Sequence, residues 1–592
     1  MDSEFTKDIA ELLHLPRQKT LSFYIVFLTA VLPVWSVVPI SWAFVAYSLL
    51  SASLWTYAWY GRALFAWALC EVFFSVYLYS LARLISGSSP HGPASLIELQ
   101  SAFKRSLQAG LAFLPEDGSD EEGGVRPGSP TEDIIALDFD DPRAVDFRNY
   151  MRTWYGKVPW SSIRKHEVYA WLSWSIYNAP FPSLESLPED EQEILRSAMS
   201  MLEKRAGIAI PDGSNPDSSP LLLTLDPINV AWRPFVWYAF IAVGNSVLRQ
   251  YLKVKWRASI GNYNGLEYIL RMPLTRSWSP ETGPHPIVFV HGLGLGLIQY
   301  NIFLTQLMEA IPDRPVLVPL HPHASQEIFH PRFLNPMNRH ESADCLAGLL
   351  RELDWVEQHR ADNGEKLDDE PKDGQRPTGV TMVSHSNGSF THAWLLKAHP
   401  EMIYRSCFVD PVTFCSWEGD LCYNFIYRRC ATGLELLMKY FVGMELGVAN
   451  FLQRHFDWSA NSLWFQDIPN ACDPSKTKFF LGGKDDVVDA EVRAIPSSWR
   501  VYTRMLIVNS ILNSVSNVIS LHTVYVKVYG SILMVDTERH SFLVAKATKK
   551  FYDGYAKPHE HPRFTHITRT SCSVTRGRHV HIYAWATLYD LG

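Results

Sequence analysis

Residues 379–397 read GVTMVSHSNGSFTHAWLLK. The first five residues are an apolar run that predicts a buried strand, and the residues from Ser389 onward predict a helix. Between them, residues 384–388 place Ser386 at the apex of a sharp turn. The pattern is that of a nucleophile elbow, G-x-S-x-G, in which Ser384 replaces the first glycine. Small residues on both sides of the apex let neighbouring chain pass closely.

A second motif lies upstream of this turn. The apolar strand of residues 286–290 runs directly into HGLGLG at residues 291–296. Taken with the serine turn, the strand and its His-Gly loop resemble the α/β-hydrolase superfamily. The alternative is a glycine-rich phosphate loop, but that motif needs a further glycine or a Gly-Lys-Ser/Thr sequence, and neither is present.

The resemblance implies an oxyanion hole made of two backbone amides. One is the N–H of Leu293, in the loop that begins with His291 and Gly292, and the other is the N–H of Asn387. Two fixed amides stabilise the charge that develops on a carbonyl oxygen during acyl transfer, and removing one such donor costs roughly 3–4 kcal/mol.

A candidate acid lies in residues 479–489, which read FFLGGKDDVVD. The superfamily commonly presents its acid after a strand that ends in Gly-x-x-Asp, so the resemblance puts the acid at Asp485. A solvated turn of three aspartates is the alternative interpretation. Asp410, at the end of the apolar stretch 405–410, is the alternative acid.

A candidate base follows the strand-like stretch 531–536. His540 lies just before a predicted helix, where the superfamily places its histidine, and the order Ser386, Asp485, His540 is that of the superfamily. The base lies 55 residues after the acid, which is a long separation. A surface histidine before a helix is the alternative.

These residues predict a serine hydrolase that cleaves an apolar acyl ester. The histidine would take the proton of the serine, and the acid would hold the imidazole in the correct tautomer. An acyltransferase or a thioesterase with the same triad is the alternative enzyme. A hydrolase-fold membrane scaffold without catalytic activity is the alternative from another class. No cofactor and no metal is expected.

Strands and helices alternate through the second half of the chain, which predicts an α/β fold with a mostly parallel sheet. Residues 411–470 form a long aromatic insertion, where the superfamily places a helical cap. The predicted strands are 266–272, 286–290, 315–320, 379–383, 405–410, 478–482 and 531–536, and the predicted helices are 342–360 and 389–398.

The N-terminus predicts transmembrane helices before this fold. No charged residue occurs in the 41 positions from Leu21 to Gly61, and a spanning helix needs about 20 apolar residues. This run is long enough for two helices with a break near Pro33 or Pro39. A third candidate, residues 63–82, contains Glu71, which decides between two and three spans.

The remaining organisation is predicted from composition. Residues 116–141 hold ten acidic residues and one basic residue, which is typical of a flexible linker. Residues 230–248 are predicted to be an interfacial or core helix, followed by basic residues that would suit an anionic surface. The predicted regions are transmembrane helices (1–85), an acidic linker (86–143), a helical, partly membrane-associated region (144–260), the hydrolase domain (261–555) and an irregular tail (556–592).

Composition limits the partners. The net charge of -7 and the absence of a basic block argue against nucleic acid, and leave an apolar ester or lipid and a membrane. The eight cysteines show no C-x-x-C pair, so we expect reduced thiols rather than a zinc site. The only glycosylation sequon begins at Asn387, inside the serine turn. It therefore favours a catalytic domain that faces the cytosol.

Overall fold

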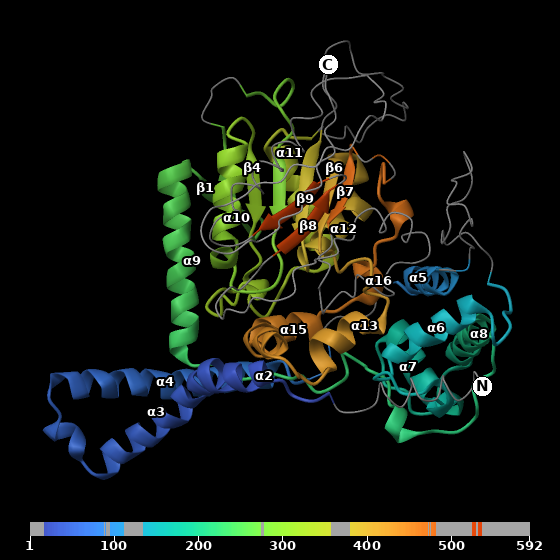
Figure 1. The fold of residues 1–592 in the computed structure, drawn as a ribbon, viewed down its shortest axis with the longest axis horizontal. Helices are drawn as coiled ribbons and strands as arrows, with labels where there is room; N and C mark the ends of the chain where they lie inside the picture. The colour runs from blue at the N-terminus through green and yellow to red at the C-terminus, as the bar shows by residue number, and fades with distance from the viewer. Residues whose placement is uncertain are drawn as a thin grey trace, which may run out of the picture.

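The computed structural model describes residues 17–87, 89, 95–109, 111, 134–273, 278–356, 379–471, 473, 475–480, 524–528 and 531–535. A seven-stranded sheet with the order β1-β2-β4-β3-β5-β6-β7 forms its centre (Figure 1). The strands are β1 (Ser259–Tyr263), β2 (Leu266–Arg271), β3 (Ile287–Val290), β4 (Val316–Pro319), β5 (Val380–His385), β6 (Ile403–Val409) and β7 (Thr477–Phe480). Strand β2 is antiparallel to β1 and β4, and all other neighbours are parallel. The predicted α/β class with a mostly parallel sheet is confirmed.

Helices cover both faces of the sheet because successive strand side chains point to opposite sides. In β3, Ile287 and Phe289 pack in one core and Val288 and Val290 in the other. Helices α9 (Phe235–Trp256) and α10 (Leu297–Ala310) supply side chains to the first core, and helices α11 (Arg339–Glu352) and α12 (Gly388–Ala398) to the second. The sheet is therefore buried on both sides, as continuous apolar strands require.

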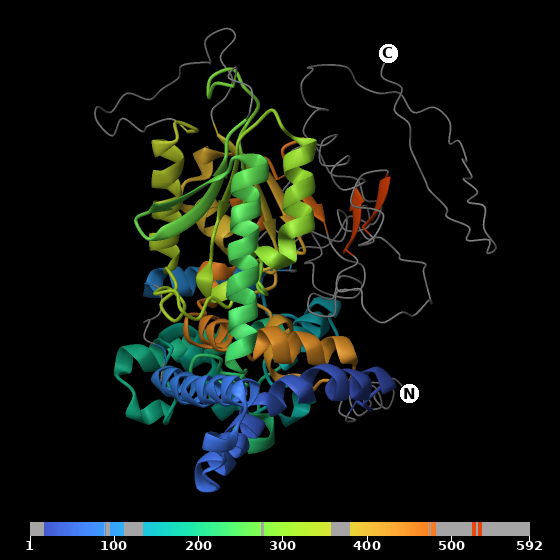
Figure 2. The same ribbon diagram turned by 90° about the vertical axis from the view of Figure 1, so that its left-hand side faces the viewer.

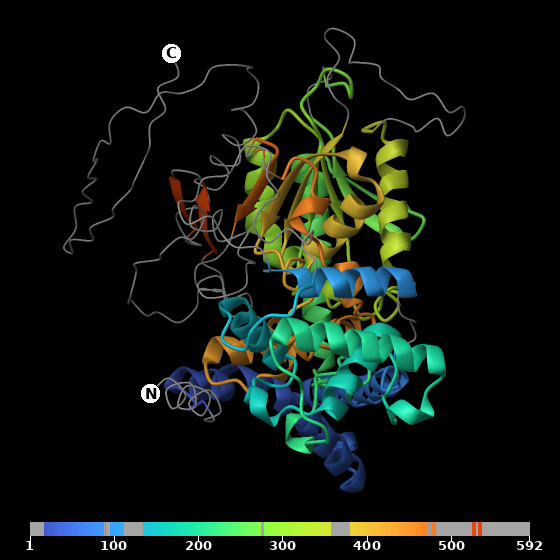
Figure 3. The same ribbon diagram turned by 90° about the vertical axis from the view of Figure 1, so that its right-hand side faces the viewer.

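A helical layer lies below the sheet in Figure 1 and combines two distant parts of the chain. Buried side chains of the N-terminal helices and of the insertion 411–470 share one hydrophobic core. The N-terminal helices are α5 (Leu96–Gln108), α6 (Pro142–Thr153), α7 (Lys165–Tyr177) and α8 (Glu189–Ala206). The insertion contains α13 (Gly419–Cys422), η8 (Tyr423–Tyr427), α14 (Gly433–Met438), η9 (Lys439–Gly443), α15 (Leu446–Arg454) and α16 (Trp458–Asn461). Figure 3 shows α5 to α8 beside these helices.

Helix α5 lies inside the predicted linker 86–143. The side chain of Ser95 accepts a hydrogen bond from the N–H of Glu98, which caps the helix. Leu99, Phe103 and Leu107 follow at helical spacing, and all three are buried. The predicted linker therefore contains a helix with an apolar face that packs in the core. Composition had concealed it, because the acidic residues lie C-terminal to the helix.

The N-terminal apolar region is a hairpin of two long helical segments. Its first arm contains α2 (Leu21–Val26), the π-helical turn η1 (Phe27–Val31) and α3 (Leu32–Leu50), and the second arm is α4 (Trp59–Leu84). The predicted break near Pro33 or Pro39 is wrong, because the first arm runs through both prolines and turns at residues 51–58. The π-helical turn lies just before the first proline, a place where such a turn accommodates the missing N–H.

Glu71 fixes the second arm to the body of the protein. Its carboxylate accepts hydrogen bonds from the backbone N–H groups of Phe235 (2.6 Å) and Val236 (3.0 Å), at the first turn of α9. A carboxylate is stabilised there because it meets unpaired amides and the positive end of the helix dipole. Phe74 and Leu78 then pack in a core with Tyr238. The acidic residue in the apolar run is therefore a structural contact between two helices.

Strands β8 (Val524–Val528) and β9 (Ser531–Val535) form a separate antiparallel pair. Residues 531–536 were predicted to add a strand to the main sheet, and that prediction is wrong for the described residues. Two residues between the strands are enough only for a hairpin, whereas a parallel partner needs a long crossover.

Short 3₁₀ turns complete the described structure at Ser53–Thr56, Trp160–Ser162, Leu184–Ser186, Pro216–Ser218, Pro322–Ala324, Pro400–Met402 and Phe465–Asp467.

Candidate active site

Ser386 occupies the turn between strand β5 and helix α12. Its backbone φ of 51° lies in the left-handed region, which costs a residue other than glycine roughly 1–3 kcal/mol. The turn is held on both sides, since the N–H of Ser386 donates to the carbonyl of Val409 (2.9 Å) and its own carbonyl accepts from the N–H of Ser389 (3.0 Å). The predicted strand, sharp turn and helix with a serine at the apex are confirmed.

Two glycines allow the chain to pack tightly around this turn. A Cβ atom on Gly388 would lie 2.5 Å from the carbonyl oxygen of Val290, so α12 can begin against the end of β3 only with glycine there. A Cβ atom on Gly292 would lie 3.0 Å from the Cβ of Ser386. The loop at residues 291–296 therefore lies directly against the serine turn.

The backbone N–H groups of Leu293 and Asn387 are free to donate hydrogen bonds to a ligand. Among the hydrogen bonds between described residues, neither of these two N–H groups is a donor. Buried backbone donors are almost always paired in folded proteins. Asn387 is buried, with 9% of its surface exposed, and its N–H follows directly after the strained residue Ser386. The two candidate oxyanion amides are therefore unpaired beside Ser386.

Ser384, which stands where the elbow pattern has glycine, has an internal partner. Its Oγ lies 2.9 Å from Nδ1 of His392 on α12, and Nε2 of that histidine lies 3.2 Å from Oγ of Ser406. All three side chains are buried, and burial lowers the pKa of His392 to about 3. The neutral imidazole thus joins strands β5 and β6 to the helix. His392 lies on the buried face of α12 and was not among the predicted site residues.

The side chain of His291 holds the loop at residues 291–296 by hydrogen bonds. Its Nδ1 lies 2.9 Å from the carbonyl oxygen of Gly292, and its Nε2 accepts the N–H of His321 at 3.3 Å. These contacts require a neutral imidazole with its proton on Nδ1. Burial lowers the pKa of His291, which favours the same neutral form. His291 and Gly292 are predicted binding residues, and these hydrogen bonds of His291 hold the loop that contains them.

Tyr300 connects the loop to the serine turn. Its hydroxyl oxygen accepts the N–H of Gly292 (2.9 Å) and lies 2.7 Å from Nδ1 of His385, the residue before Ser386. The hydroxyl therefore bridges the loop at residues 291–296 and the residue before Ser386. Burial raises the pKa of Tyr300, so the hydroxyl keeps its proton. One side chain thus sets the spacing between the two halves of the site.

We expect Tyr300→Phe to lower kcat by roughly ten- to a hundredfold with little change in KM, because small misplacements of reacting groups have effects of that size. Steady-state kinetics on a chromogenic ester measures both quantities. Tyr238→Phe is the matched control, since its buried hydroxyl donates to Glu445 (2.8 Å) away from the site. Equal losses of kcat in the two variants would show that Tyr300 acts only through stability.

The structure places one of the two candidate acids. Asp410 follows β6 with a φ of 44°, and its Oδ2 lies 4.0 Å from Nε2 of His385. Its N–H donates to the carbonyl of Phe480 (2.8 Å), at the end of β7. Asp485 and His540 lie outside the described residues. Because β7 is parallel to β6, its last residue, Phe480, lies at the same edge of the sheet as Ser386.

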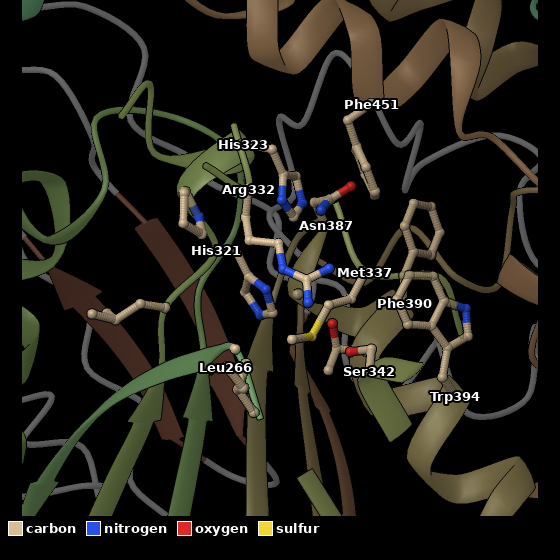
Figure 4. A pocket seen from close by; sticks show the side chains of 15 residues that line it. Leu266, His321, His323, Arg332, Met337, Ser342, Asn387, Phe390, Trp394 and Phe451 are labelled. Atoms are coloured by element: carbon tan, nitrogen blue, oxygen red, sulfur yellow. The ribbon is translucent and has the colours of Figure 1, made fainter. Parts of the chain in front are cut away.

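Two cavities lie along helix α12, which follows the serine turn. A small one of about 30 Å³ is lined by Asn387, Gly388 and His323, and Figure 4 shows Asn387 beside His323 and Phe451. A larger one of about 710 Å³ lies between the sheet and the helical layer. Trp394 and Phe451 line both cavities, and Ser386 is not part of the lining of the larger cavity. Its size is within the range of about 300–1,000 Å³ typical of ligand pockets.

A strained serine between a central parallel strand and a helix, at the carboxyl edge of this sheet, defines the α/β-hydrolase fold. The chain therefore has the fold of that superfamily.

No family model and no curated protein matches the chain. Among solved structures, it is similar to Cfl2 from Burkholderia cenocepacia (12% identity, TM-score 0.17), where the match covers 26% of this chain and 41% of that one. It is also similar to a bacterial membrane phospholipase A (13% identity, 45% and 83% covered, TM-score 0.23). A third match is the peroxisomal alpha-beta-hydrolase Lpx1 from Saccharomyces cerevisiae (13% identity, 40% and 72% covered, TM-score 0.24). At these TM-scores the fold assignment depends on the strand order and the turn at Ser386.

Proposed function

We propose that this chain is a membrane-anchored serine hydrolase that cleaves an apolar acyl ester. The observation that carries the proposal is the left-handed backbone of Ser386 at the edge of the sheet. Strain of this kind clusters at active sites, and here it falls directly after the central strand β5, at its carboxyl end. The unpaired amides of Leu293 and Asn387 support the same interpretation.

The proposed reaction has two steps. Ser386 Oγ attacks the acyl carbon while His540 takes its proton, and the ester C–O bond breaks as the histidine returns that proton to the alcohol. Water then attacks the acyl-serine, the histidine takes its proton and passes it to Ser386 Oγ as the acyl C–Oγ bond breaks, and the carboxylic acid leaves. Asp485 keeps the histidine in the correct tautomer. The N–H groups of Leu293 and Asn387 stabilise the oxyanion in both steps.

The larger cavity favours an apolar acyl group. Three tryptophans line it, and each has its indole N–H already bonded: Trp174 to Thr224 (2.7 Å), Trp394 to Asn461 (3.2 Å) and Trp458 to Ser175 (2.9 Å). With their polar atoms satisfied, these side chains offer a ligand mainly ring surface, which suits hydrocarbon. Arg339 and Glu98, which pair with each other, also line the cavity and would meet a polar group.

A fluorophosphonate probe tests the proposed activity directly, because it forms a covalent bond only with an activated serine. We expect the full-length protein in detergent to be labelled at Ser386 and to hydrolyse nitrophenyl esters of medium or long acyl chains. A folded protein that is neither labelled nor active would instead support the scaffold alternative.

Membrane anchoring is the second part of the proposal. Among the described residues, two helical segments, Leu21–Leu50 and Trp59–Leu84, are long and apolar enough to cross a bilayer. Both ends of the hairpin return to the body. Arg17 pairs with Glu435 (2.7 Å) at the start of the first arm, and Glu71 binds α9 from the second. The hairpin therefore inserts from the side of the membrane on which the catalytic domain lies.

We expect the full-length protein to remain in the membrane pellet after alkaline carbonate extraction and to need detergent for release. Outside a bilayer, the hairpin would expose large apolar side chains to water, which is strongly unfavourable. Western blotting of pellet and supernatant measures the distribution, with a peripheral protein of the same membrane as control. Release into the supernatant by carbonate would contradict the anchoring proposal.

A further inference from the structure

Helix α9 is apolar on two opposite faces. Its inner face packs on the hydrolase core through Tyr238, Ile241, Leu248 and Leu252. Its outer face carries six large apolar side chains that are between 37% and 83% exposed, at spacings of three or four residues. They are Val236, Phe240, Val243, Val247, Tyr251 and Val254. A helix that is apolar all round is normally covered on all sides. The outer stripe therefore needs a partner.

The charge on α9 is of one sign only. The helix contains no acidic residue, and cations gather at its C-terminal end. Arg249 pairs with Glu327 (2.9 Å) and Glu267 (3.5 Å), and Lys255 pairs with Glu309 (3.0 Å). Lys253 and Arg257 are exposed, and neither belongs to an ion pair among the described residues. An exposed apolar stripe flanked by cations is typical of a helix in the interface of an anionic membrane.

The hairpin projects from the same side of the molecule. In Figure 1 helices α3 and α4 extend to the left from the base of α9, and Figure 2 shows α9 in front of the sheet with the hairpin at its lower end, in front of the helical layer. The hairpin runs away from the end of α9 in Figure 1 rather than along it. Trp35 and Trp232 stack at its base with ring centroids 5.9 Å apart, just before α9 begins. Tryptophan prefers the headgroup level of a bilayer.

We propose that α9 lies in the membrane surface along its whole outer stripe, while the hairpin, which runs away from the end of α9, enters the bilayer. This proposal depends on the membrane anchoring proposed above. The bilayer is favoured over a second copy of the chain because a partner copy would bring a second set of cations and no acid from α9. The two contacts together fix the orientation of the catalytic domain on the membrane.

The test places a fluorescent amino acid, dansylalanine, at position 247 of the full-length protein, with position 208 as the control. Ile208 is also exposed, at 39%, but lies after α8 in the helical layer. The protein is reconstituted into phosphatidylcholine vesicles that contain one-third phosphatidylserine and is isolated by flotation. We expect a blue shift and quenching by nitroxide-labelled lipid at position 247, and neither effect at position 208.

A second variant separates the role of the stripe from that of the hairpin. Phe240→Asp puts a charge in the centre of the stripe, so the label at 247 should return to aqueous emission while the protein still floats. Lys253→Gln with Arg257→Asn should reduce the response to phosphatidylserine, because each cation near an anionic surface changes binding by roughly fivefold.

Three outcomes would overturn the proposal. A protein that floats with an aqueous label at 247 anchors through the hairpin alone. A blue shift that appears in detergent without vesicles and grows with protein concentration identifies a second copy as the partner. A protein that does not float at all removes the membrane anchoring, and the proposal for α9 with it, but leaves the esterase proposal intact because probe labelling tests that separately.

Discussion

Ser386→Ala is expected to abolish both ester hydrolysis and fluorophosphonate labelling. Without the nucleophile, turnover in a serine hydrolase of this type falls by roughly 10⁶-fold, and only slow residual catalysis by the oxyanion amides remains. The folded state should change little, since the backbone bonds of the turn do not use the Ser386 hydroxyl. Activity assays and thermal melting of the two proteins measure both expectations.

Two neighbouring serines serve as controls for this substitution. Ser384 is buried against His392, and Ser389 Oγ accepts the N–H groups of Val412 (3.1 Å) and Thr413 (3.2 Å). Ser384→Ala and Ser389→Ala are therefore expected to lose stability but to keep probe labelling. Undiminished labelling of Ser386→Ala would end the proposal that Ser386 is the nucleophile.

Asp485→Asn is expected to lower turnover by roughly 10⁴-fold while the serine and its turn stay intact. An asparagine at the acid position holds the histidine in the wrong tautomer and does not compensate the charge of the imidazolium. Steady-state rates with a nitrophenyl ester measure the loss. Because Ser386 is unchanged in this variant, slow stoichiometric probe labelling should still occur.

Asp410→Asn is the matched comparison, and its loss is expected to be far smaller. Asp410 faces His385 at 4.0 Å, and that histidine is already held by Tyr300. We therefore expect this carboxylate to act on the spacing of the turn rather than on a catalytic base. The reverse ranking of the two variants would make Asp410 the acid of the triad. It would also make the insertion 411–470 part of the catalytic loop.

The local motifs were readable in the sequence because each depends on residues close together along the chain. The strand, the serine turn and the helix occupy residues 379–398, and hydrophobic periodicity with one small residue is enough to predict them. The loop at residues 291–296 follows its strand without a gap. The parallel sheet then follows from the alternation of such strands with helices.

Contacts between residues that are distant in the sequence could not be predicted in this way. Ser384 departs from the elbow pattern, and only the folded chain shows that His392 is its partner. Glu71 looked like an obstacle to a membrane span, yet its carboxylate caps a helix 164 residues away. The hydroxyl of Tyr300 joins a glycine 8 residues before it to a histidine 85 residues after it. No local pattern predicts a hydrogen bond over such separations.

The sequence alone determined the class of fold, the position of the strained serine and the presence of a long apolar N-terminus, because periodicity and small residues act over a few positions. Only the tertiary structure decided how these parts are arranged. Packing makes one core from the N-terminal helices and the insertion, directs both ends of the hairpin to the body, and leaves the outer stripe of α9 uncovered. Those outcomes depend on which surfaces meet when the chain folds, and burial selects the surfaces from the whole molecule at once.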